Sequence, residues 1–197
     1  MKISLLNRFY LLGCFVLLSL PGISQVKTVE TDIFTVTYSE HLEQPLKLEY
    51  KVQCPGGTAK REGISWKKDL NIKTSDAEDY KKNVWDRGHL APAAAFSCDQ
   101  ETIKKTFTYL NCALQHEGLN RGPWKELERF ERDLAYFFEV TVVIEVEFAE
   151  EPMRVPTGAA IPKGFFKTIS IEGSSWRFYF PNGDMAGKPW SYFSIAK

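Results

Sequence analysis

The residues best suited to chemistry lie in one short segment, 86–92, which reads Asp-Arg-Gly-His-Leu-Ala-Pro. His89 has an ordinary pKa close to neutrality, so it could act as a general base toward water. Arg87 carries a planar guanidinium whose N–H donors match two oxygens of a phosphate. Gly88, which has no side chain, would let a phosphate approach the backbone. These residue types point to chemistry on a phosphate ester, although Arg-Gly-His alone is also typical of an ordinary surface turn.

A second group of polar residues lies downstream, on the clearest predicted helix. At about 100° per residue, Asn120, Trp124, Glu128 and Arg132 form a row with i, i+4 spacing, and Asn120 and Pro123 occupy the expected cap and first turn. The adjoining apolar sector consists of Leu127, Phe130, Leu134, Phe137 and Phe138. The row could bring an amide oxygen, a carboxylate and a cation to one place, with Trp124 in the core. The simpler interpretation is a solvated helix face with an ion pair between Glu128 and Arg132.

The elements that must position these groups are strands on either side of that helix. Alternating β-type residues predict an antiparallel pair, and a Gly-, Lys- and Asp-rich stretch after it predicts a long loop. The pair covers 31–38 and 46–52, the loop 55–83, and further β-type runs cover 106–110, 140–148, 165–171 and 176–180. Strands, one long helix and more strands predict a single α+β domain.

Residues 1–24 predict a secretory signal peptide. A basic start precedes an apolar run at 9–20, and Gly22 and Ser24 place small residues just before a cut that leaves 25–197 as the single domain. The apolar run is shorter than the ~20 residues of a membrane-spanning helix. We therefore expect a secreted or periplasmic protein that keeps no stable membrane anchor after cleavage.

Charge and cysteine content narrow the function further. The chain has 25 basic and 25 acidic residues, whereas a protein that binds nucleic acid by charge alone would be strongly basic. An enzyme needs only a local positive groove. Beyond the predicted signal peptide, Cys54, Cys98 and Cys112 allow at most one internal disulfide, whose pairing stays open. Without a Cys-x-x-Cys pair, we expect no structural zinc site.

Several segments together resemble one known family. They are residues 86–92, Asn111 with Gln115, and the row from Asn120 to Arg132. In that order and at that spacing they resemble the DNA/RNA non-specific endonucleases, the ββα-metal nucleases, and the resemblance extends over about residues 34–192. It implies the ββα-metal fold, an antiparallel sheet with a long metal-binding helix. The implied activity is metal-dependent hydrolysis of phosphodiester bonds in DNA and RNA without sequence preference.

The resemblance also implies roles for individual residues in the reaction. His89 would deprotonate the attacking water, and Asn111 would orient its imidazole. Asn120 would be the only direct protein ligand of Mg²⁺, with Mn²⁺ as the alternative metal, and Glu128 would hold metal-bound waters. This fits the chemistry of Mg²⁺, which keeps most of its waters and accepts few protein ligands.

Arginines would hold the substrate. Arg87 and Arg132 correspond to residues that contact the phosphate and its transition state, and Arg61 resembles an upstream phosphate-binding arginine. We see no segment typical of a base-reading module, so DNA and RNA would be held through the phosphates they share. Two alternatives remain: a catalytically weak relative that binds nucleic acid, and a phosphodiesterase acting on smaller nucleotides.

The second half of the chain departs from the family pattern. Members carry a Thr-Gly-Pro-like turn after the strand that follows the helix, whereas residues 143–149 run into a shortened path toward Val155. The chain end at 194–197 also lacks an expected closing helical segment. These departures affect stability and substrate grip more than the catalytic positions.

Overall fold

The computed structural model describes residues 26–195, and the predicted signal peptide lies outside this range. Nine strands are assigned within it. They are β1 (Val26–Glu30), β2 (Thr35–Ser39), β3 (Gln44–Lys51), β4 (Trp85–His89), β5 (Cys112–His116), β6 (Thr141–Glu147), β7 (Gly164–Ile171), β8 (Ser174–Pro181) and β9 (Ser194–Ile195). The strands predicted at 140–148, 165–171 and 176–180 are confirmed as β6, β7 and β8.

The helical segments are mostly short. They are η1 (Glu78–Tyr80), η2 (Ala93–Phe96), α1 (Gln100–Lys105), η3 (Tyr109–Asn111), α2 (Glu117–Leu119), the π-helical turn η4 (Asn120–Trp124), α3 (Lys125–Leu134) and η5 (Trp190–Phe193). Within the described range, none of them has the length and apolar character that crossing a membrane requires.

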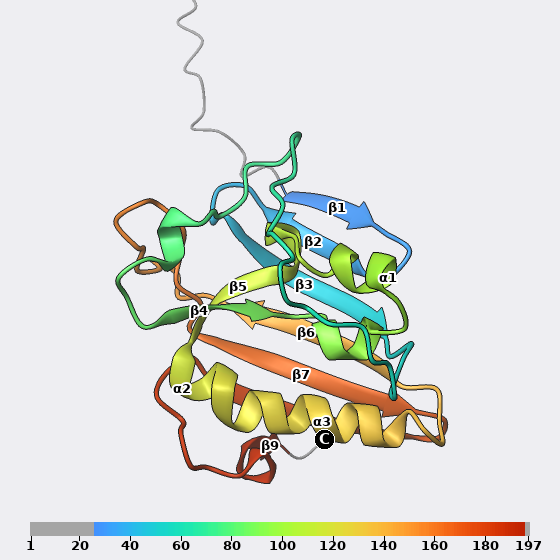
Figure 1. Cartoon of the computed structure of the whole chain (residues 1–197). Helices are drawn as coiled ribbons and strands as arrows, with labels where there is room; N and C mark the ends of the chain where they lie inside the picture. The colour runs from blue at the N-terminus through green and yellow to red at the C-terminus, as the bar shows by residue number, and fades with distance from the viewer. Residues whose placement is uncertain (1–25, 196–197) are drawn as a thin grey trace, which may run out of the picture.

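Seven strands form one antiparallel sheet in the order β1-β2-β3-β6-β7-β8-β9. Alternation along the strands gives the sheet one buried face and one polar face, where Arg177 of β8 pairs with Glu145 of β6 at 2.9 Å. Helix α3 and the β4–β5 pair lie over the buried face (Figure 1). This is the predicted α+β architecture, an antiparallel sheet with a helix laid across it.

Aromatic packing fixes α3 and the turn before it on the sheet. Trp124 is fully buried, and its ring lies 5.5 Å from Phe165 and 5.4 Å from Phe180 between centroids. Leu127 is also fully buried, one turn further along the same side of the helix. The predicted place of Trp124 in the core is confirmed.

The start of the helix differs from the prediction. Helical structure begins at Glu117, where the His116 ring accepts a hydrogen bond from the Gly118 amide at 3.1 Å. Asn120 therefore opens a π-helical turn rather than capping a helix. Gly122 has non-helical backbone angles within this turn, and Pro123 supplies no N–H.

The end of the helix was also predicted incorrectly. Helix α3 stops at Leu134, and the turn after it leaves Phe137 81% and Phe138 49% exposed instead of packed in the apolar sector. Leu134 and Phe130 pack against the core as predicted.

A separate two-stranded sheet carries residues 86–89 of the 86–92 segment. β4 pairs with β5 in antiparallel register, with Gly88 opposite Ala113 and His89 opposite Cys112. The strand predicted at 106–110 is reduced to one isolated bridge between Thr108 and Lys67, because η3 follows at once and β5 starts only at Cys112.

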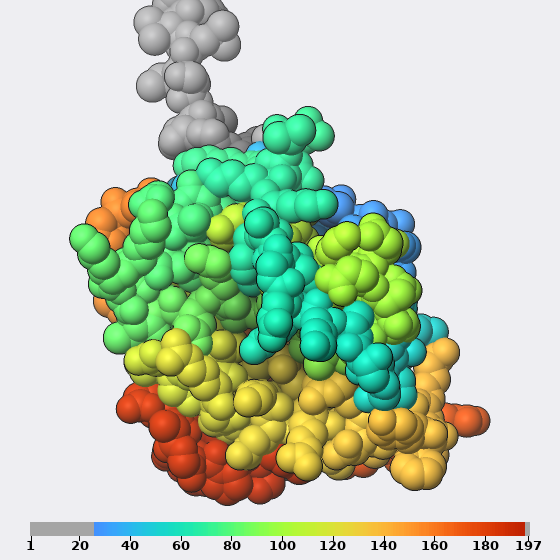
Figure 2. Space-filling model, in the orientation of Figure 1, coloured from blue at the N-terminus to red at the C-terminus, as the bar shows by residue number. Residues whose placement is uncertain are grey.

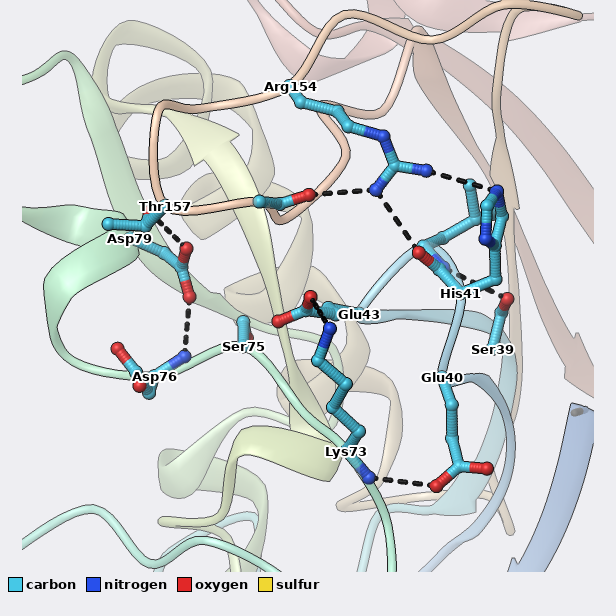
Figure 3. Close-up of polar contacts among 12 residues, drawn as sticks. Ser39, Glu40, His41, Glu43, Lys73, Ser75, Asp76, Asp79, Arg154 and Thr157 are labelled. Carbon is cyan, nitrogen blue, oxygen red and sulfur yellow. Dashed lines mark hydrogen bonds and ion pairs between the residues drawn. The ribbon is translucent and has the colours of Figure 1, made fainter. Parts of the chain in front are cut away.

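The shortened path after β6 is held against two other loops by polar contacts (Figure 3). Arg154 donates to the backbone oxygen of His41 at 3.1 Å and to that of Gly158 at 2.7 Å. Thr157 donates to buried Asp79, which also accepts from the Asp76 amide at 2.6 Å. The loop is thus anchored beside η1 although it lacks the turn typical of the family.

Candidate active site

One cleft of about 1110 Å³ opens between α3 and the loop that follows β3, and Figure 2 shows its open side. Six of the seven residues that the sequence analysis singled out line this cleft: Arg61, Arg87, His89, Asn120, Glu128 and Arg132. They come from a loop, from β4 and from the helical segments around α3. The fold thus brings together residues that are up to 71 positions apart.

His89 ends β4 and lies among aromatic rings. Its imidazole is 4.7 Å from the ring of Trp66 and 5.0 Å from that of Phe107, between centroids. Its Nε2 atom is buried and has no hydrogen-bond partner among the described residues. Burial and then the charge of Arg61 lower the pKa of His89 to about 3. The imidazole is therefore neutral, as a general base requires.

Asn111 has a different role from the predicted one. The hydrogen bonds of its side-chain amide go to the backbone and not to His89: Oδ1 accepts from the Ala91 amide at 2.8 Å, and Nδ2 donates to the oxygens of Ala91 and Thr106, both at 2.9 Å. Asn111 is fully buried, and these bonds use its polar atoms on the backbone just after β4. It therefore holds the chain that carries His89, whereas Trp66 and Phe107 orient the imidazole.

Asn120 is oriented by Asp86, a residue to which the sequence analysis gave no role. Asn120 Nδ2 donates to Asp86 Oδ2 at 2.8 Å, and Arg121 donates to both carboxylate oxygens at 2.9 and 2.7 Å. Burial raises the pKa of Asp86, but the bonds from Arg121 and Asn120 outweigh it and hold the pKa below its ordinary value. Because an ionised carboxylate only accepts, the Asn120 amide oxygen must point away from Asp86 and stays free for another ligand.

Glu128 lies deeper in the cleft, among charges of both signs. Burial raises the pKa of Glu128 to about 7, the charge of buried Lys167 opposes this rise, and Glu131 adds to it. Arg132 donates to the Glu128 backbone oxygen at 2.8 Å rather than to its carboxylate. The i, i+4 ion pair of the simpler interpretation is therefore absent, and Arg132 leaves the carboxylate available to a ligand in the cleft.

Arg87 is held between two aromatic rings. Its guanidinium carbon lies 5.9 Å from the ring centroid of Trp66 and 5.8 Å from that of Tyr80, and its buried Nε has no partner among the described residues.

Gly88 has a different purpose from the predicted approach of a phosphate. A Cβ at Gly88 would lie only 2.5 Å from that of Gln115, so glycine allows β4 and β5 to pack closely here.

The loop that carries Arg61 is tied to the segment after His89. Cys54 and Cys98 form a disulfide with their Cα atoms 5.3 Å apart, and Cys112 is free and buried. Backbone bonds run from Cys54 to Ala95 at 3.0 Å and from Ala59 to Ser97 at 3.0 Å. These links hold this wall of the cleft opposite α3.

The donor set fits a divalent cation that keeps most of its water. Among residues 26–195, no three His, Cys, Asp or Glu side chains are grouped as a metal cluster. The cleft instead offers the free amide oxygen of Asn120 and the carboxylate of Glu128, both oxygen donors. Hard cations with slow dehydration bind through such sparse oxygen sets, whereas zinc takes three or four protein ligands.

Fold and cleft define a ββα-type centre, with a histidine at the end of a strand and an asparagine amide in the helical turn that precedes α3. A family profile gives the particular group: DNA/RNA non-specific endonuclease, matched over residues 19–196. The chain belongs to this family.

Individual relatives agree with this assignment. Mitochondrial nuclease EXOG of Xenopus laevis is 34% identical over 104 residues, 51% of this chain and 28% of the relative. Mitochondrial endonuclease G of Bos taurus is 26% identical over 177 residues, 79% of this chain and 57% of the relative. A chain of an EndoG/EndoGI complex superposes with a TM-score of 0.78 at 22% identity, covering 90% of this chain and 82% of its own, which shows the shared fold. The chain thus spans between about a quarter and three fifths of the length of these two mitochondrial relatives.

Proposed function

We propose that this protein is a metal-dependent endonuclease that hydrolyses phosphodiester bonds in DNA and RNA without reading their sequence. The observation that carries the proposal is the cleft itself. A neutral histidine, a free amide oxygen, the carboxylate of Glu128 and four arginines face one space. A binding protein would need the arginines but not the base, nor the metal-suited oxygen pair.

The chain's own residues divide the work of the reaction. His89 would accept a proton from the water that attacks phosphorus, and its place at the end of a paired strand fixes its position. Arg87, preorganised between two rings, would hold a phosphate with little loss of side-chain freedom. Arg132 and Arg61 add positive charge from opposite walls of the cleft.

Mg²⁺ is the metal we propose, with Mn²⁺ as the alternative. Asn120 would be the direct protein ligand, positioned by Asp86, and Glu128 would accept hydrogen bonds from the water shell. When bound, the ion would polarise the phosphoryl oxygens and stabilise the leaving oxygen. The raised pKa of Glu128 describes the protein without this charge, and a nearby cation would lower it.

One experiment tests the proposed activity. Purified protein would be incubated with supercoiled plasmid and with total RNA, each with Mg²⁺ and with EDTA. We expect degradation of both substrates to a broad distribution of products with Mg²⁺ and none with EDTA. Discrete fragments that map to one site would contradict the absence of sequence preference, and cleavage confined to dinucleotides would favour a small-nucleotide phosphodiesterase.

We also propose that the protein works outside the cytoplasm, secreted or in the periplasm. The amino-terminal pattern supports this, as does the disulfide between Cys54 and Cys98, because such bonds persist mainly in oxidising compartments. Mass spectrometry of protein made in a secreting host should find a start at or near Gln25. Cytoplasmic protein that starts at Met1 would refute the proposal.

A further inference from the structure

Three consecutive aromatic residues lie exposed just after α3. Tyr136 is 60%, Phe137 81% and Phe138 49% exposed, in a turn whose amides bond back to Leu134 at 3.0 Å. Exposed aromatic side chains next to a cleft are candidates for contact with the ligand of that cleft. The position of these residues relative to the cleft indicates which kind of ligand would contact them.

Tyr136 lies beside the cleft, outside its lining. It follows Arg132, which lines the cleft, by four residues, or about 6 Å along a helix axis. A Cβ built on Gly56 would lie 2.9 Å from the Tyr136 hydroxyl, and the next residue, Gly57, lines the cleft. The aromatic turn therefore lies where the helix meets the loop after β3, and Figure 2 shows these gold and teal surfaces in contact.

At this end of the cleft a cation is followed by an aromatic ring, just as a phosphate is followed by a base along a single strand of nucleic acid. Arg132 offers a cation for a phosphate, and Tyr136 offers a rigid ring face one step further on. Bases stack on aromatic side chains whatever their identity, so such a platform adds affinity without sequence preference. A paired base already stacks within its duplex, so only an unpaired base can use the ring.

We propose that Tyr136 is a stacking platform for an unpaired nucleobase of a strand that leaves the cleft past Arg132. The inference rests on the proposed nuclease function and adds a preference for single-stranded segments. Stacking on one aromatic side chain contributes about 5- to 150-fold to affinity. We expect about tenfold for this partly exposed ring.

Binding can be measured apart from cleavage. Fluorescein-labelled single-stranded oligothymidylate of twelve nucleotides would be titrated with protein in EDTA, with fluorescence anisotropy as the readout. Tyr136→Ala should weaken binding about tenfold, and Tyr136→Trp should restore it. The control is Tyr192→Ala, because Tyr192 is 67% exposed but lines a different pocket, together with residues of β8 and β9.

The requirement for a nucleobase at the stacking position supplies a sharper test. In oligonucleotides with one abasic position, wild-type binding should weaken at one particular position, and Tyr136→Ala should be insensitive there. Equal binding by wild type and Tyr136→Ala would overturn the inference. The inference would also be overturned if Tyr136→Ala differed from wild type only in its oligomeric state, measured by size-exclusion chromatography. These aromatic residues would then contact a second copy of the chain. A protein that binds through Tyr136 but cleaves nothing would refute the proposed activity alone.

Discussion

Lys167 gives the most demanding test of how the cleft is supported. It lies in β7 in phase with buried Phe165, beneath the helix that carries Glu128. Its ammonium is 2.6 Å from Glu131 and 4.2 Å from the ring centroid of Trp124, and its side chain is fully buried. Lys167→Met keeps the approximate length of the side chain and removes the charge, which leaves Glu131 without its cation.

The size of the effect follows from burial. Removing one partner of a buried ion pair costs about 3–5 kcal/mol, because the remaining charge stays desolvated. Tyr50 still donates to Glu131 at 2.6 Å, so we expect the lower half of this range. For a domain of this size each kcal/mol lowers Tm by about 2–4 °C, so Lys167→Met should melt about 6–16 °C lower.

Thermal unfolding followed by circular dichroism would measure this change. The double variant Lys167→Met/Glu131→Leu should recover more than half of the loss, because it removes both charges. Lys163→Met is the surface control: Lys163 pairs with Glu147 at 2.9 Å but is 58% exposed, so its Tm should change by little. A Lys167→Met protein that melts within about 2 °C of wild type would show that the pair does not support the helix.

Four further predictions concern activity and the disulfide. His89→Ala should lower kcat at least about 10²-fold with an unchanged circular dichroism spectrum, and comparable turnover would remove His89 from the mechanism. Asn120→Ala should nearly abolish plasmid cleavage at every Mg²⁺ concentration, whereas Glu128→Gln should lose activity at low Mg²⁺ and partly regain it at high Mg²⁺. Because the pKa of His89 is about 3 and that of Glu128 about 7, lowering the pH from 7 to 5 leaves the base neutral but protonates Glu128. The decrease of kcat/KM at acidic pH should therefore become smaller at saturating Mg²⁺. A decrease near pH 6.5 that does not depend on the Mg²⁺ concentration would contradict this. Replacing Cys54 and Cys98 with serine should lower the free energy of unfolding by about 2–4 kcal/mol in urea titrations and raise KM.

The sequence was sufficient for features that depend on local pattern. Alternating residues located β6, β7 and β8, because each strand has one buried and one polar face. The resemblance to the DNA/RNA non-specific endonucleases, carried by the order and spacing of the motifs, placed His89 and Asn120 in one site, and both line the cleft.

Features set by distant contacts could not be predicted. The interruption at Gly122 changes the phase of the helix, so a continuous count of 100° per residue does not apply across it. Asn111 looked like a partner of His89, but its bonds go to the backbone of Ala91, which only the fold brings near. The alternation along β7 places Lys167 on the buried face, where a lysine is unexpected. Only the structure shows the reason, which is the ion pair with Glu131.

The disulfide has a topological consequence for resistance to proteolysis. Cys54 and Cys98 close a covalent ring that contains Arg61 and His89, whereas Asn120 lies outside it. Much of this ring is exposed loop, the kind of chain that proteases cut first. A single cut in the loop before His89 opens the ring without releasing a fragment, because Cys54 on the amino-terminal piece stays bonded to Cys98 on the piece that carries His89 and Asn120. Such a nicked molecule would run as one species on a gel until its disulfide is reduced.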